Sequence, residues 1–143
     1  TGEKNADLIY QLQSWNRQTK LGVVFDSSTG FKLSNGATRS PDVSWIASKR
    51  WNSLSDRQKR GFAPIDPDFA IELLSPTDEL STTQAKMNEY MTCGVKLGWL
   101  INPDAKKVEI YRVGRDKEVI NHPSSLSGEE LLPGLIVDLA DIF

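Results

Sequence analysis

The chain has 143 residues, of which 38% are hydrophobic and 25% charged, and its formal net charge is −2. These values are ordinary for one globular domain spanning residues 1–143. Every apolar run is shorter than the about 18 residues of a membrane-spanning helix. The ten Gly and seven Pro are scattered singly rather than in tracts. Membrane-spanning, collagen-like and low-complexity classes are therefore excluded.

The single cysteine, Cys93, cannot pair within the chain. Its isolation excludes an internal disulfide framework and a thiolate zinc centre, and it fits the reducing cytoplasm, where we expect the protein. The sequence opens at Thr1 without an initiator Met or a signal segment, so we expect that some N-terminal residues precede it.

Charge is distributed unevenly along the chain. Residues 1–60 hold ten Lys or Arg against five Asp or Glu, whereas residues 61–143 hold seven against fourteen. The basic excess is concentrated between Arg39 and Arg60, around Trp51. Cations beside an aromatic side chain are typical of a surface that follows a phosphate backbone, but they also form ordinary solvated helix faces. The cations that we consider for DNA contact are Lys49, Arg50, Lys59 and Arg60.

The first half of the chain predicts one long helix followed by strands. Leu8, Leu12 and Trp15 recur at helical spacing and predict a helix from about residue 3 to 18. Short apolar runs then predict two strands joined by a turn, at 21–25 and 30–33, and a third strand at 42–46. A polar, basic segment at 48–63 predicts a helical excursion or a mobile loop.

The second half predicts a central strand, a helix and further strands. Residues 68–74 are apolar enough for a central strand, which ends at Pro76 because proline has no N–H for the ladder. A helix follows from about 78 to Gly94, where a residue free to adopt positive φ closes it. Later strands are expected at 97–101, 108–113 and 118–120, and the segment 126–143 is expected to seal the core edge. The order predicts a single α/β domain.

Two carboxylates stand at positions where a charged side chain is costly. Asp42 opens one predicted strand, and Glu72 lies inside the most hydrophobic strand. If these strands are neighbours, both carboxylates can bind one hard divalent cation, with the Leu73 carbonyl as a third oxygen and waters as the rest. Alternatively, Glu72 forms an internal ion pair and Asp42 caps a turn.

Lys86 is the basic residue best placed to join these carboxylates. It follows Glu72 by 14 positions, on the helix after the Glu72 strand, and shares a helix face with Thr82 and Tyr90. From this face its amine can point over the end of the sheet, and the Tyr90 ring can pack against its stem. The alternative is an ordinary surface lysine.

Other catalytic classes have little support in the sequence. Cys93 stands at a predicted helix C-terminus, where the helix dipole opposes thiolate formation. The only histidine, His122, precedes a proline in a polar turn, and the chain contains no nucleophile elbow and no glycine-rich phosphate loop.

The order of elements and several motifs resemble the PD-(D/E)XK nuclease superfamily, and more closely its Uma-type family of restriction-endonuclease-like proteins. The resemblance covers most of the chain. Its motifs are Ser40-Pro41-Asp42-Val43, the segment from Pro67 to Pro76, Lys86 with Tyr90, the segment from Gly94 to Leu100, and Leu131-Leu132-Pro133-Gly134-Leu135.

This resemblance implies a restriction-endonuclease-like core of helix, three strands, helix and strand, with a central mixed sheet flanked by helices. It further implies an endonuclease that hydrolyses DNA with Mg²⁺ or Mn²⁺, in which Asp42 and Glu72 hold the metal. Because the basic stretch from Arg39 to Arg60 follows the strand of Asp42, we expect it to flank this metal site. The superfamily pattern places a lysine two residues after the second acid, where Leu74 stands here, whereas the Uma-type pattern supplies it from the following helix, as Lys86. Glu3 resembles the acid of the first helix, and a homodimer is expected.

Two other functional classes stay open at this stage. A protein can keep the nuclease fold as a DNA-binding or regulatory module without turnover, because fold alone does not establish activity. An interaction module whose exposed tryptophans meet a protein partner is a third possibility.

Overall fold

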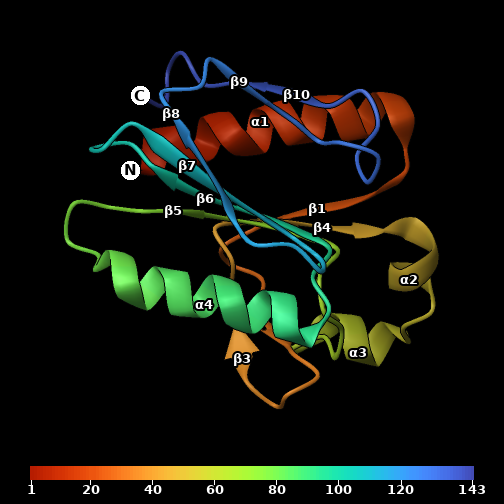
Figure 1. The fold of residues 1–143 in the computed structure, drawn as a ribbon. Coiled ribbons are helices and arrows are strands. Elements are labelled where there is room, and N and C mark those ends of the chain that lie inside the picture. Colours follow the sequence, from red (N-terminus) through yellow and green to blue (C-terminus); the bar gives the residue numbers. More distant parts are fainter.

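The computed structural model describes all residues from 1 to 143, and its centre is a six-stranded mixed sheet (Figure 1). The strand order is β1-β4-β5-β6-β7-β8, in which only β5 and β6 pair in parallel. The strands are β1 (Gly22–Asp26), β4 (Val43–Ala47), β5 (Phe69–Leu73), β6 (Leu97–Asn102), β7 (Lys107–Arg112) and β8 (Glu118–Asn121). The mixed α/β architecture expected from the sequence is confirmed.

One face of the sheet is covered by the first helix and the end of the chain. Helix α1 (Gly2–Thr19) buries Leu8 and Leu12, two members of the predicted apolar stripe. Beside it lies a two-stranded ribbon of β9 (Ser125–Ser127) and β10 (Ile136–Asp138), which packs on the same core (Figure 1). The last segment therefore seals this core, as predicted.

The opposite face is covered by helix α4 (Leu80–Cys93). Its buried Met87 lies against the sheet at Gly98, where an added Cβ would come within 2.7 Å of the Met87 methyl carbon. The helix ends at Gly94, whose φ of 123° is the positive value predicted for this position. Because side chains alternate along β5, Phe69 and Ile71 face α1 whereas Ala70 and Glu72 face α4.

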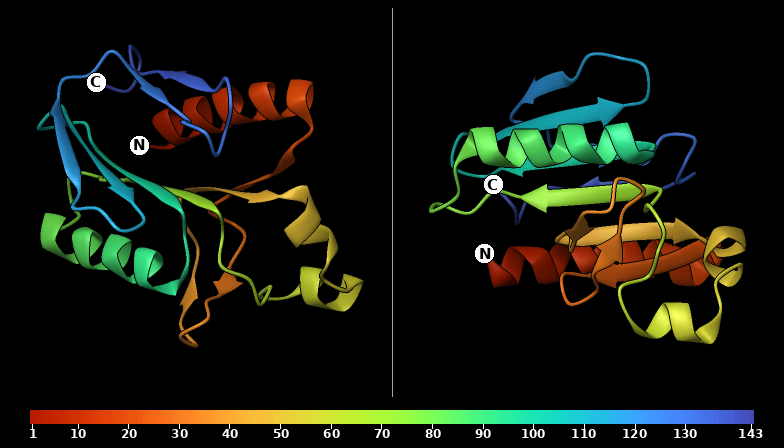
Figure 2. Two further views of the ribbon diagram at one scale, coloured as in Figure 1. Left: turned by 45° about the vertical axis from the view of Figure 1, so that its right-hand side comes forward. Right: turned by 90° about the horizontal axis from the view of Figure 1, so that it is seen from below.

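The predicted pairing of residues 21–25 with 30–33 is wrong. β1 pairs with β4 in the main sheet, and β2 (Phe31–Lys32) pairs with β3 (Thr38–Arg39) in a separate ribbon that projects from the sheet (Figure 2). A tight turn after residue 25 predicted a hairpin, but the apolar β1 gains more by adding to the large sheet.

The segment 48–63 forms two short helices, which is the first of the two alternatives, helical excursion or mobile loop, that its sequence left open. They are α2 (Ser48–Asn52) and α3 (Asp56–Arg60), and Ser55 caps α3 through a hydrogen bond from the Gln58 backbone N–H. Both helices follow the C-terminal end of β4, and in Figure 1 they lie on the side of the sheet away from the β5–α4 loop. Across the whole chain, none of the helices has the length and apolar character that a membrane crossing requires.

Candidate active site

Asp42 and Glu72 stand opposite each other on neighbouring antiparallel strands. The ladder between β4 and β5 pairs Val43 with Ile71, so the next position brings Asp42 across from Glu72. The Asp42 backbone N–H donates to Glu72 Oε2 at 3.0 Å, and the Leu73 N–H donates to Asp42 Oδ2 at 2.8 Å. Strand pairing thus brings together two acids that are separated by 30 residues.

Both carboxylates are withdrawn from water. Glu72 is only 4% exposed, and Asp42 is half-buried. Burial raises the pKa of Asp42, against the lowering effects of the Leu73 N–H and the Lys86 charge. Burial also raises the pKa of Glu72, and the neighbouring Asp42 charge raises it further. Like charges directly opposite each other destabilise a sheet, and this arrangement is typical of a site that binds a cation.

Lys86 completes the cluster from α4. Its Nζ lies 2.9 Å from Glu72 Oε1, and its side chain is 38% exposed. This contact forms because α4 follows β5 directly and crosses the sheet face toward which Glu72 points. The internal ion pair considered as an alternative for Glu72 is therefore present, with the partly exposed Lys86 as its cation. Tyr90, one turn further along α4, is fully buried, and its hydroxyl has no hydrogen-bond partner.

A pocket of about 470 Å³ opens over this cluster. Asp42, Glu72, Leu73 and Lys86 line it, together with two further acids, Asp78 and Glu79, and with hydroxyl-bearing residues of the surrounding loops and of α4. The hydroxyl-bearing residues are Thr1, Ser40, Ser75, Thr77, Thr82 and Thr83. This set of hard oxygens is suited to a divalent cation such as Mg²⁺.

Only two acids, Asp42 and Glu72, are joined in this cluster, and Asp78 and Glu79 line the pocket without a hydrogen bond to either. No group of three or more His, Cys, Asp or Glu side chains in the structure could hold a metal ion. Mg²⁺ commonly uses one or two carboxylates and keeps several waters or substrate phosphate oxygens as its other ligands. Asp42, Glu72 and the Leu73 carbonyl therefore fit a magnesium site, and Asp42 Oδ1 accepts no hydrogen bond from another residue.

The basic stretch does not flank this pocket, so that expectation is wrong. Asp42 lies before β4, whereas Lys49, Arg50, Lys59 and Arg60 lie on α2 and α3, after the opposite end of the same strand. Arg50 has a structural partner there, because its Nη1 lies 3.0 Å from Oδ1 of the fully buried Asp68. Lys59 lies over the Trp51 ring, 5.6 Å from its centroid.

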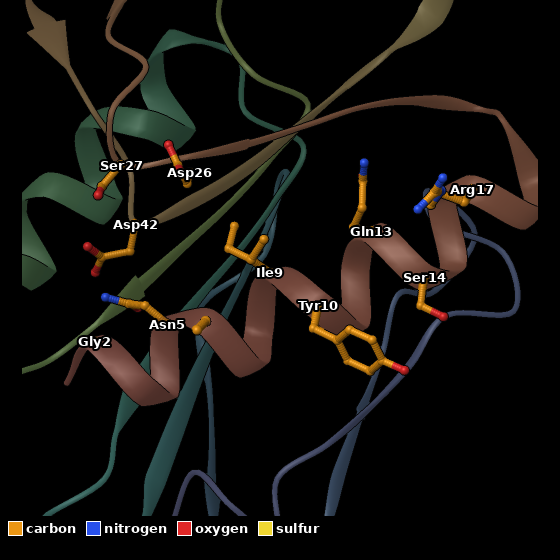
Figure 3. A pocket seen from close by; sticks show the side chains of 11 residues that line it. Gly2, Asn5, Ile9, Tyr10, Gln13, Ser14, Arg17, Asp26, Ser27 and Asp42 are labelled. Carbon is orange, nitrogen blue, oxygen red and sulfur yellow. The ribbon is translucent and has the colours of Figure 1, made fainter.

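Glu3 does not reach the pocket. It is exposed in the first turn of α1, and no hydrogen bond or ion pair joins it to Asp42 or Glu72. Two residues further along, Asn5 is about 200° around the helix from Glu3 and points to the side where Asp42 lies (Figure 3). Sequence reasoning missed Asn5; the available signal was a polar residue that continues the apolar stripe of α1, three residues before Leu8 and seven before Leu12.

The fold and this carboxylate–lysine cluster define a restriction-endonuclease-like α/β domain. A family model, Uma2, described as "Putative restriction endonuclease", matches residues 1–140, so the chain belongs to this family. The resemblance noted from the motifs is confirmed.

Solved structures share the fold. One of them is described as a "putative nuclease belonging to DUF820" from Anabaena variabilis, and it superposes with a TM-score of 0.76 at 21% sequence identity. The match covers 90% of this chain and 71% of that one. Among curated proteins, none matches the chain.

Proposed function

We propose that this protein is a nuclease that hydrolyses DNA phosphodiester bonds with Mg²⁺ or Mn²⁺. One observation carries the proposal: Asp42 and Glu72 face each other across two strands, and Lys86 lies 2.9 Å from Glu72 at the open end of the pair. Membership of a family described as restriction endonucleases supports the same substrate class.

Each residue has a distinct role in the proposed reaction. The Asp42 and Glu72 carboxylates and the Leu73 carbonyl would hold the cation. When bound, such a cation lowers the pKa of a coordinated water and neutralises charge on the phosphate. The Lys86 ammonium has three N–H donors, one of which is directed to Glu72. The other two can orient the attacking water and stabilise the negative charge that develops on the phosphate oxygens.

Chemically, the water oxygen forms a bond to phosphorus as the bond from phosphorus to the leaving sugar oxygen breaks. The attacking water loses a proton to solvent, and the leaving oxygen gains a proton from solvent, so the step balances. Glu72 keeps Lys86 in place through their ion pair, so the position of the ammonium depends on the same carboxylate that would hold the cation.

The direct test is cleavage of labelled single-stranded and duplex DNA with Mg²⁺, Mn²⁺ or EDTA. We expect metal-dependent cleavage by the wild type and its loss in Asp42→Asn. Asp141→Asn, an exposed acid near the C-terminus, is the matched control and should retain wild-type activity. Absence of cleavage with either metal, or equal cleavage by Asp42→Asn, would contradict the proposal.

A second candidate function is a nuclease-fold DNA-binding or regulatory protein without turnover. The observation in its favour is that Lys86 already neutralises Glu72 in the absence of metal. This candidate predicts DNA binding without cleavage, and no change in thermal stability when Mg²⁺ or Mn²⁺ is added.

We also propose a homodimer, because duplex DNA has two-fold symmetry and symmetric dimers match it. Val113, in the turn after β7, and Val119 and Ile136, in β8 and β10, are exposed apolar side chains. Sedimentation equilibrium should show a dimer, and a monomer at high protein concentration would rule this assembly out.

A further inference from the structure

A groove along α1 borders the carboxylates, outside the pocket described above (Figure 3). It has a volume of about 690 Å³ and runs between α1 and the loop after β1. Asp42 lines both this groove and the pocket over Glu72. A strand whose phosphate occupies the pocket would therefore continue into the groove.

The groove offers groups that recognise nucleobases. Asn5 lines the groove, and its buried Oδ1 accepts no hydrogen bond from another residue. Gln13 provides a second carboxamide on the same wall. Carboxamides pair with the hydrogen-bonding edges of bases, including unpaired ones. Tyr10, also on this wall, is 70% exposed and presents a ring on which a base can stack.

The charged residues and the volume of the groove suit single-stranded DNA better than duplex DNA. The groove has one cation, Arg17, about 18 Å along α1 from Asn5, whereas Asp26 and Asp42 stand at its other end. Duplex binding depends on many phosphate contacts by cations, which this groove does not offer. Its volume is in the range of pockets that hold small molecules, so it can take individual nucleotides but not a double helix.

We propose that the groove along α1 binds unpaired nucleotides next to the scissile phosphate, with Tyr10 stacking on a base, Asn5 and Gln13 contacting base edges, and Arg17 contacting a phosphate. This inference rests on the proposed nuclease function and narrows its substrate to DNA that is single-stranded or frayed at the cleavage site.

Binding is measured by fluorescence anisotropy with a labelled 12-nucleotide single strand and a hairpin duplex, in Ca²⁺ to limit turnover. Tyr10→Ala should weaken single-strand binding by about 5- to 150-fold, the effect of removing one stacking ring, whereas Tyr10→Phe keeps the ring and should bind almost normally. Arg17→Gln should reduce the salt dependence of binding.

Two variants serve as matched controls. Phe62→Ala removes an aromatic ring of similar exposure, 67%, outside the groove, and Arg115→Gln removes an exposed cation outside the groove. Neither should change single-strand affinity. Thermal melts verify that each variant is folded, which is expected because Tyr10 and Arg17 are exposed.

The two proposals can fail separately. If Tyr10→Ala binds the single strand as tightly as Phe62→Ala does, or if the wild type prefers the duplex, the groove assignment is overturned even when DNA is cleaved. If the single strand binds through Tyr10 but no metal supports cleavage, the groove assignment stands as a binding site and the nuclease function fails.

Discussion

The ammonium of Lys86 lies 2.9 Å from Oε1 of Glu72, although 14 residues and a change of secondary structure separate them. The superfamily pattern places its lysine two residues after the second acid, where this chain has Leu74. Leu74 is apolar and packs against the core beneath α4. Lys86, on α4, supplies the cation that contacts the Glu72 carboxylate. The position of the cation relative to the acids, rather than its place in the sequence, defines the site.

Glu72→Gln should not destabilise the metal-free protein strongly. The substitution removes a desolvated negative charge and its repulsion from Asp42, and the Lys86 left without a partner is 38% exposed and can be hydrated. Thermal melts with and without Mg²⁺ measure this. We expect a metal-dependent rise in melting temperature for the wild type only. Marked destabilisation without metal, together with no metal effect on the wild type, would contradict the active-site assignment.

Lys86→Met should abolish most cleavage while retaining metal binding. Removing one donor that stabilises developing negative charge typically lowers the rate by about 10²- to 10³-fold. Cleavage rates at saturating Mn²⁺ and metal affinity by calorimetry separate the two effects, with the exposed Lys107→Met as control. Equal rates for Lys86→Met and Lys107→Met would exclude a catalytic role for Lys86.

The contribution of Asp42 and Glu72 to the stability of the metal-free protein should decrease as the pH rises. Their pKa values are raised in the folded state, so folding favours their protonated forms. The stability this contributes is fully present below the unfolded pKa values, near 3.8 and 4.5, and is lost as pH rises through the higher folded values. Asp42→Asn should therefore gain stability relative to the wild type from acid to neutral pH.

Urea unfolding at a series of pH values, without metal, measures this difference. A constant difference in the free energy of unfolding between Asp42→Asn and the wild type across this range would show that Asp42 titrates normally.

Removing both cationic partners of Asp68 should destabilise the protein more than replacing its carboxylate by a neutral amide. It is fully buried, its Oδ1 lies 3.0 Å from both Arg50 Nη1 and Lys96 Nζ, and its Oδ2 accepts the Ala47 N–H. The double variant Arg50→Met with Lys96→Met leaves a buried charge unpaired and should cost about 3–5 kcal/mol. Asp68→Asn should cost less, because both cations are partly exposed. Urea unfolding provides the comparison, and the reverse order would contradict this account.

The basic stretch can be tested independently of the pocket. Because Arg50 has a structural role, the informative variant neutralises Lys49, Lys59 and Arg60 together, as Gln. If these residues contact duplex DNA, the slope of log affinity against log salt should decrease by about 0.9 for each phosphate contact that is lost. Anisotropy titrations between low and physiological salt measure the slope. An unchanged slope would identify the stretch as a solvated surface.

Much of this protein follows from local sequence. The apolar stripe of α1, the apolar run around Glu72 and the glycine that ends α4 each predict their element, because helices and strands have short, regular periods. The motifs around Asp42, Glu72 and Lys86 predicted the family and the residues of the pocket. A lone carboxylate in a buried strand is informative because it requires a partner.

Only the tertiary structure decided how these pieces meet. The antiparallel register of β4 and β5 sets Asp42 opposite Glu72, and a slip of one residue would turn Glu72 to the other face. Pairing of β1 with β4, and the placement of the basic helices at the far end of β4, likewise depend on contacts between distant residues. Local propensity does not encode such contacts, because strand pairing is decided by packing across the whole sheet.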